Sequence, residues 1–211
     1  MGYFGIFSAI LNGNPDDIAL FFKNHFKENI SQRKDREDFY YRDDILIYSS
    51  QNGWVVIKWS REFFSYDETS KILSKTFDAL VSAVNIYDGD FWEHKFYKNG
   101  ELLDTFHSAP DYFEEINEKL LRFIDPGKPH VIAEELKIEV EKISPYFNRE
   151  RNLDALPKKA FPEDIYNVSD GLVFIDFWNK IGIRLPEDHE IPQHAFEMDD
   201  KYMREMMFAR F

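Results

Sequence analysis

Residues 81–107 carry two short turn signals, and these constrain the fold more than any other feature of the chain. Asp88-Gly89 and Asn99-Gly100 are dipeptides that favour two-residue type I′ hairpin turns, and runs of strand-forming residues flank both of them. Three consecutive antiparallel strands follow from this pattern. We predict them over residues 81–87, 91–98 and 101–107.

The preceding segments predict a layered α+β fold. They give a strand, a helix, two strands and a second helix, over residues 3–10, 15–29, 44–49, 53–60 and 68–80. Together with the first hairpin strand, the order β-α-β-β-α-β is that of the ferredoxin-like arrangement, and a two-strand meander extends it. We expect a mostly antiparallel sheet with both helices on one face.

Helix-start signals support both helices. Asn14 is a capping residue, Pro15 suits the first helical position, and Asp16 and Asp17 face the positive end of the helix dipole. Ser65 stands three residues before Glu68, which is the spacing of a capping box.

The chain beyond residue 110 reads as helical. We predict helices over residues 111–124, around Ile132, Leu136, Val140 and Ile143, over 168–181, and near 199–211. The breaker at residues 125–129 divides the chain into a sheet domain, 1–125, and a helical C-terminal region, 126–211. Because helices on one face leave the other face bare, we expect the C-terminal region to pack on that face as part of one unit.

Charge and composition exclude several classes of protein. The 211 residues include 26 Lys and Arg against 39 Asp and Glu, for a net charge of −13, which disfavours nucleic acid and favours a basic protein partner. The basic residues Arg33, Lys34 and Arg36 alternate with acidic ones and give no basic patch. No cysteine occurs and no apolar stretch is long enough for a membrane span, so we expect a soluble cytoplasmic protein with no membrane partner.

Motifs for cofactor and metal chemistry are missing from the sequence. There is no phosphate-binding glycine loop and no Gly-x-Ser-x-Gly, and we therefore expect no cofactor. His189 and His194 lie among acidic residues, but a five-residue spacing interrupted by Pro192 does not place them on one helix face. We expect a solvated loop there and no metal site.

The predicted hairpins place a set of polar and aromatic side chains on one face of the sheet. With two-residue loops, that face carries Ala83 and Phe96 together with the candidate ligand-binding residues Asn85, Trp92, His94, Thr105 and His107. Lys95 stands opposite Asp104 on the other face. Two histidines, an indole, an amide and a hydroxyl could bind a polar small molecule or move a proton.

A plainer interpretation of this face is that it packs beneath the C-terminal helices. As predicted, it contains no carboxylate to orient either imidazole and no nucleophile besides Thr105.

Aromatic residues make up 17% of the chain, which is typical of interfaces as well as of cores. The terminal helix presents an apolar face that could bind a partner or form a homodimer, and its residues are Tyr202, Met203, Met206, Met207 and Phe208. The alternative is that this helix docks on its own domain.

Two functions from different classes remain. The first is a non-enzymatic module that binds a basic protein through an acidic, aromatic-rich surface, as an immunity protein or antitoxin would. The second is a small-molecule-binding protein or enzyme that uses the Trp92, His94 and His107 face.

Overall fold

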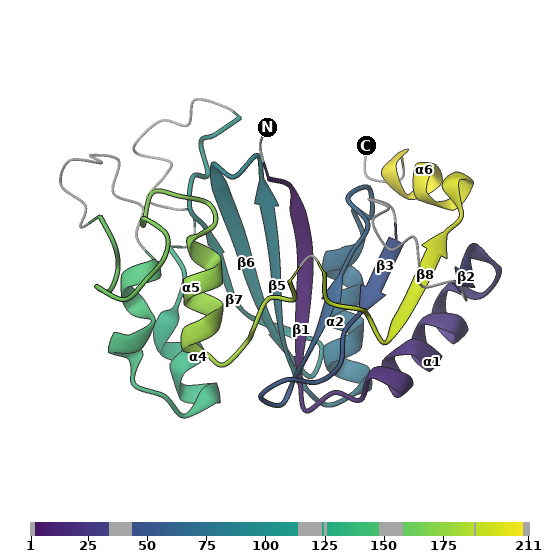
Figure 1. Ribbon diagram of the computed structural model, residues 1–211, viewed down its shortest axis with the longest axis horizontal. Helices are drawn as coiled ribbons and strands as arrows, with labels where there is room; N and C mark the ends of the chain where they lie inside the picture. The colour runs from purple at the N-terminus through teal and green to yellow at the C-terminus, as the bar shows by residue number, and fades with distance from the viewer. Residues whose placement is uncertain are drawn as a thin grey trace.

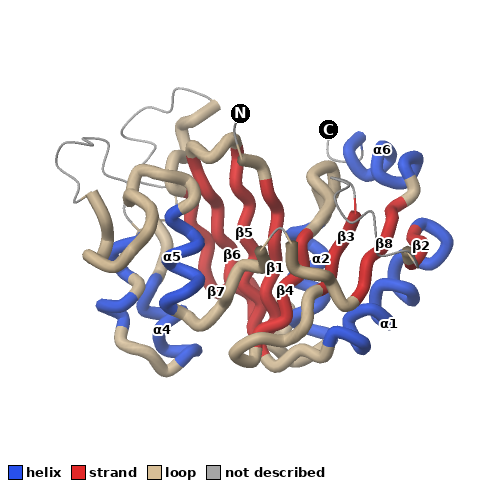
Figure 2. The backbone as a smooth tube through the Cα atoms, viewed as in Figure 1, coloured by secondary structure: helices blue, strands red, loops and turns tan. Residues whose placement is uncertain are grey.

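The chain forms a mixed α+β structure built on an antiparallel sheet of eight strands (Figures 1 and 2). The computed structural model describes residues 3–33, 44–113, 124, 126–147, 158–187 and 189–208. Its strands are β1 (Gly5–Leu11), β2 (Ile30–Gln32), β3 (Asp44–Ile47), β4 (Trp54–Lys58), β5 (Leu80–Tyr87), β6 (Phe91–Lys98), β7 (Glu101–His107) and β8 (His194–Met198). Its helices are α1 (Pro15–Phe26), α2 (Tyr66–Thr76), α4 (Pro129–Leu136), α5 (Val173–Lys180) and α6 (Asp200–Phe208).

The strands lie in the order β2-β8-β3-β4-β1-β5-β6-β7, and every neighbouring pair is antiparallel. β8 was not predicted, because five residues after a proline-containing loop give no local strand signal. It returns from the end of the chain to lie between β2 and β3. The C-terminal region therefore contributes to the sheet as well as covering it.

Each face of the sheet has its own hydrophobic core. On one face, Ile18 and Phe22 of α1 and Leu73 of α2 are fully buried against side chains of the central strands. On the opposite face, Phe177 and Trp178 of α5 are fully buried. Successive residues of a strand point to opposite faces, so the central strands must be apolar on both sides.

The helix boundaries agree with the predictions in part. The Asn14 side chain accepts hydrogen bonds from the backbone N–H groups of Asp16 and Asp17 and caps α1 as expected. The capping box at Ser65 was wrong, since its side chain makes no capping hydrogen bond. The helix predicted around residues 132–143 ends at Leu136 because Lys137 adopts a left-handed conformation, with φ of 56°. Beyond residue 113, nearly all of the helix predicted over 111–124 lies outside the described residues.

The register predicted for β5 and β6 was wrong by one residue. Tyr87 pairs with Phe91, so the turn contains three residues, with Asp88 and Gly89 at φ of 54° and 77° and Asp90 as the third. The one-residue slip reverses which β5 side chains share a face with a given β6 side chain. Val84 therefore stands opposite His94.

The register of β6 and β7 is correct only next to the Asn99-Gly100 turn. A bulge at Leu103 shifts the pairing, so that Lys95 lies opposite Thr105 and not on the face of Asp104. Asp104 faces the other way, and its carboxylate accepts the backbone N–H of Lys128 at 2.6 Å.

A directed chain of hydrogen bonds crosses the core between the sheet and α2. Trp59 Nε1–H donates to Ser8 Oγ at 2.8 Å, and Ser8 Oγ lies 2.8 Å from Ser70 Oγ. Because the Ser70 hydroxyl donates to the carbonyl of Tyr66, it must accept from Ser8. Ser8 thus satisfies two buried polar groups at once.

A second polar group lies buried on the other face. Trp178 Nε1–H donates to Ser82 Oγ at 3.0 Å, and Ser82 Oγ lies 2.9 Å from His94 Nε2. His94 is fully buried, and its Nδ1 has no hydrogen-bond partner among the described residues. Burial lowers the pKa of His94 to about 3, so the ring is neutral at ordinary pH.

Side chains also fasten the connection between α5 and β8 to the β3–β4 turn. Arg184 donates from Nη1 to Gln51 Oε1 at 2.8 Å and from Nη2 to Glu190 Oε2 at 3.2 Å. Gln51 Nε2 closes the triangle by donating to Glu190 Oε1 at 2.7 Å. This network holds the segment that carries the chain from one layer back to the sheet.

We predict that Ser8→Ala lowers the free energy of unfolding by about 1–3 kcal/mol, because the buried indole N–H of Trp59 loses its acceptor. Urea denaturation followed by tryptophan fluorescence measures the change. The control is Ser169→Ala at an exposed turn position, for which we expect a change within about 0.5 kcal/mol. Equal effects of the two substitutions would contradict this account.

His94 also predicts a pH dependence of stability. Unfolding exposes the ring and returns its pKa from about 3 to 6.5, so the unfolded chain binds a proton that the folded chain does not. Stability therefore falls as pH drops below 6.5, and we expect His94 to contribute a loss of about 2 kcal/mol between pH 7 and pH 5. Urea denaturation of His94→Gln should show a shallower decline over this range. His189→Gln, at a side chain that is 81% exposed, should leave the decline unchanged.

Candidate functional site

The five predicted ligand-binding residues are divided between two faces of the sheet. Trp92 and His94 are buried beneath α5, with 1% and 0% of their surface exposed. Asn85, Thr105 and His107 lie half-buried on the opposite face. The division follows from the three-residue turn and the Leu103 bulge, and no single ligand could touch all five side chains.

The half-buried face holds a carboxylate that the sequence pattern did not reveal. Glu93 Oε1 lies 3.1 Å from His107 Nε2, and Asn85 Nδ2 donates to Glu93 Oε2 at 3.4 Å. The predicted register had placed Glu93 on the other face, so the expectation that no carboxylate orients an imidazole was wrong for His107. Periodicity along β6 alone could not reveal this, because the bulge lies in β7.

Hydrogen bonding fixes the role of the His107 ring. The backbone N–H of Ala109 donates to His107 Nδ1 at 3.1 Å, so Nδ1 is the unprotonated nitrogen. Nε2 then carries the proton and donates to Glu93. Both nitrogens are engaged, and the ring ties the chain after β7 to the sheet.

Two opposing effects act on the pKa of Glu93. Burial raises it, while hydrogen bonds from His107 and Asn85 and the nearby positive charge of Lys95 lower it, and the net pKa lies below the usual value. Glu93 is therefore ionised at neutral pH.

A second set of hydrogen-bonded polar side chains lies next to the Glu93–His107 pair on the same face. Lys95 Nζ lies 2.5 Å from Asp67 Oδ2 at the start of α2, and the Tyr97 hydroxyl donates to the other oxygen of Asp67. Burial and the Asp67 carboxylate raise the pKa of Tyr97, so its hydroxyl stays protonated. These contacts fix the first turn of α2 on β6.

Beyond the polar pairs, aromatic rings gather where β5 ends and β6 begins. We call the exposed rings of Tyr87, Tyr112 and Phe113 the aromatic patch, and they are 37%, 41% and 64% exposed. All three contact the buried ring of Phe91, at centroid distances of 5.5, 4.8 and 5.7 Å. His107 stacks on Phe91 as well, at 4.7 Å, so the patch and the Glu93–His107 pair are continuous.

Carboxylates border the aromatic patch. The Tyr112 hydroxyl donates to Asp90 Oδ2 at 2.6 Å. This hydrogen bond, with smaller contributions from desolvation and the negative charge of Asp88, raises the pKa of Tyr112 to about 12. Glu93, two residues after Phe91 on β6, lies on the same face of the sheet. The surface therefore combines exposed apolar rings with carboxylates.

The backbone that carries the patch is held from the opposite layer. Gly171, two residues before α5, donates its N–H to the carbonyl of Gly89 at 2.9 Å. A Cβ at position 171 would lie 2.7 Å from that oxygen, so the close approach requires glycine. The three-residue turn is thus held by the segment that precedes α5.

The terminal helix docks on its own sheet where its side chains are described. Met203 is buried in the core of the α1 and α2 face, and Tyr202 packs against Phe26. The side chains of Met206, Met207 and Phe208 lie outside the described residues. A partner or homodimer contact through these three side chains stays a prediction.

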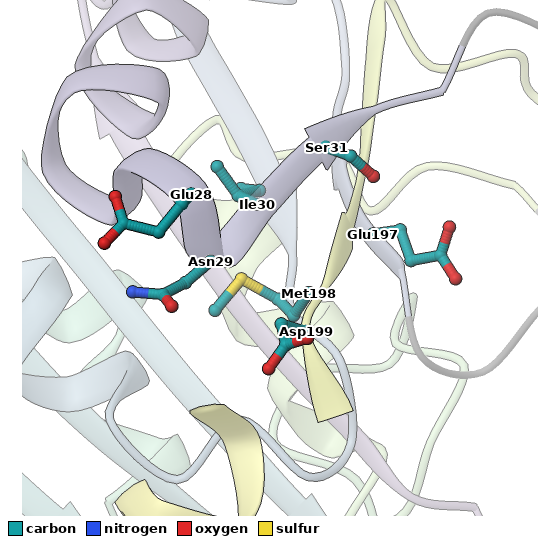
Figure 3. Close-up of a pocket in the computed structure, with 7 residues that line it drawn as sticks. All are labelled: Glu28, Asn29, Ile30, Ser31, Glu197, Met198 and Asp199. Atoms are coloured by element: carbon teal, nitrogen blue, oxygen red, sulfur yellow. The ribbon is translucent and has the colours of Figure 1, made fainter. Parts of the chain in front are cut away.

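A shallow acidic pocket of about 390 Å³ lies at the other end of the sheet, where β2 pairs with β8 (Figure 3). Its walls are Glu28, Asn29, Ile30, Ser31, Glu197, Met198 and Asp199. Glu28 and Glu197 point to opposite sides in Figure 3, so their carboxylates do not converge. Asp199 accepts the backbone N–H of Tyr202, and Glu197 lies 3.7 Å from Arg33, so both also serve the local structure.

His189 lies in a loop as expected, but the expectation of a loop at His194 was wrong because this residue begins β8, and the two histidines make separate contacts. His194 Nε2 lies 2.8 Å from Asp16, and His189 lies 3.4 Å from Glu187. Within the described ranges, no group of three or more His, Asp or Glu side chains is arranged to hold a metal ion. None of the helices described is long and apolar enough to cross a membrane.

Comparison with known proteins gives no further guide. The chain has no significant match to a protein-family model, to a curated protein or to a solved structure.

We predict that His107→Phe raises the pKa of Glu93, because burial persists while the hydrogen bond that offsets it is lost. The carboxyl ¹³C shift of Glu93, followed by NMR between pH 2 and pH 8, reports the change. Thr105→Val, on the same strand and face, should leave the titration unchanged. A Glu93 titration that is identical in His107→Phe and the unsubstituted protein would show that the contact does not form.

Proposed function

We propose that this protein is a non-enzymatic module that binds a basic protein partner through the aromatic patch and its carboxylates. The observation that carries the proposal is the exposure of three large aromatic rings, Tyr87, Tyr112 and Phe113, in one acidic area. Large exposed apolar groups are costly unless a partner covers them, and Tyr and Phe are enriched in the centres of interfaces.

The negative charge of the chain supports a positively charged partner. At −13, the protein repels other acidic molecules and attracts basic ones over long distances. Neutralisation of a basic toxin by an immunity protein or antitoxin is the form of binding that fits this charge. The lack of cysteine favours a reducing compartment such as the cytoplasm.

We also propose that β3, β4, β1 and β5, with α1 and α2, form a ferredoxin-like unit. Numbered along the chain, these four strands lie in the order 2-3-1-4 with antiparallel neighbours, and both helices pack on one face. In this interpretation β6 and β7 extend the unit on one side, and β8 and β2 on the other.

The small-molecule alternative now has a different set of residues. Trp92 and His94 are inaccessible to a ligand, whereas Asn85, Glu93 and His107 lie together on a half-exposed face. Hydrogen bonds within the protein already engage both His107 nitrogens, which favours a structural role for the ring. We therefore prefer protein binding.

A cationic peptide tests the proposed function. We expect a twelve-residue peptide of alternating glycine and basic residues, with equal numbers of Lys and Arg, to bind more weakly as salt rises. Amide shift changes in NMR spectra should centre on residues 87–93 and 107–113. The same peptide with glutamine at every basic position should not bind.

Matched variants test whether the carboxylates beside the aromatic patch bind the peptide. Asp88→Asn with Asp90→Asn should weaken binding about threefold or more, since each rim charge contributes up to about 1 kcal/mol. Glu101→Gln with Glu139→Gln changes the total charge equally, at exposed positions outside the patch. Equal weakening by both pairs, or shift changes centred on the acidic pocket, would contradict binding at the patch.

A further inference from the structure

We infer that the aromatic patch recognises an arginine side chain of the partner, in preference to lysine. This inference rests on the proposed function and adds the chemistry of the recognised group. A guanidinium is planar and weakly hydrated, so it can stack on an aromatic ring while its N–H groups donate to carboxylates in its own plane. A lysine ammonium is strongly hydrated and lacks a stacking face.

The protein itself places a guanidinium at the margin of this surface. The Cζ atom of Arg61 lies 5.9 Å from the centroid of the Phe4 ring. Phe4 in turn packs edge-to-face against Tyr87, at 5.0 Å and 82°. The ring cluster to which the patch belongs therefore already accommodates one arginine by a cation–π contact.

The remaining rings offer more faces of the same kind. Phe113 is nearly perpendicular to both Tyr87 and Tyr112, at 80° and 86° and centroid distances of 4.9 and 5.1 Å. In an edge-to-face pair the edge of one ring covers a single face of the other, so the remaining faces, which carry the negative part of the quadrupole, stay uncovered by that pair. With 64% of Phe113 exposed, an incoming guanidinium can reach them.

Carboxylates complete the chemistry of the proposed site. Asp90 is fixed beside Tyr112 by the 2.6 Å hydrogen bond from the phenol, which leaves capacity on the carboxylate for further donors. Lys95, the basic residue of the neighbouring polar face, is bound by Asp67 at 2.5 Å. An arginine that stacks on the rings would therefore meet acceptors of the right sign close by.

Two matched peptides test the inference. Each has twelve residues with glycine alternating with a basic residue, all Arg in one and all Lys in the other, and affinity is measured by NMR titration at one salt concentration. We expect the Arg peptide to bind the patch about threefold more tightly or better. The Arg-to-Lys affinity ratio is the readout because long-range charge affects both peptides equally.

Substitutions of the aromatic residues test whether the rings cause the preference for the Arg peptide. Tyr112→Leu with Phe113→Leu keeps apolar side chains but removes two of the three exposed rings, and the ratio should fall towards one. Tyr112→Phe keeps the ring and should retain the preference. The control is Phe161→Leu, because the ring of Phe161 is already covered by Lys180, whose Nζ lies 4.2 Å from the centroid.

The outcomes separate this inference from the proposed function. An Arg preference that the leucine variants remove supports both. Equal affinity of the two peptides, with shift changes centred on residues 87–93 and 107–113, overturns the arginine inference and leaves the proposed function standing. Failure of both peptides to perturb these residues overturns both proposals.

Discussion

The pairing of Tyr87 with Phe91 across a three-residue turn is the constraint on which the proposed binding surface depends. It places both rings on the α2 side of the sheet and brings Glu93 onto that side as well. The bulge at Leu103 then brings His107 to the same face. If the turn were one residue shorter, the β5 side chains that now share a face with Phe91 and Glu93 would point to the opposite face, where α5 covers the sheet.

The strand register also places two histidines in different environments. His94 is enclosed among aromatic rings, and burial keeps its imidazole neutral. His107 stays at the surface, where Glu93 and the Ala109 N–H hold both nitrogens. The residue types that first indicate chemistry are thus used for packing and for anchoring a segment. The aromatic patch stays exposed beside the β5–β6 turn, which the contact between Gly171 and Gly89 holds in place.

Local signals predicted the local structure well. Asn14 and Pro15 marked the start of α1, Asn99-Gly100 formed a two-residue turn, and apolar spacing located α2 and α5. The wrong or missing predictions concern interactions between residues that are far apart in the sequence or that depend on tertiary packing. Asp88-Gly89 is compatible with loops of two or three residues, and only packing decides between them. The strand at residues 194–198 exists because β2 and β3 offer hydrogen bonds from about 150 residues away in the chain, and Glu93 became visible as a site residue only once the register was known.

The place of β8 in the sheet has a consequence for how a growing chain can fold. β3 is buried along its whole length and pairs with β4 on one side, while its other partner is β8. β2 joins the sheet through β8 as well. During synthesis the backbone edge of β3 therefore stays without its partner until residues 194–198 have left the ribosome. In that interval the nascent protein carries an apolar, open edge, the kind of edge that chaperones cover and that aggregation exploits.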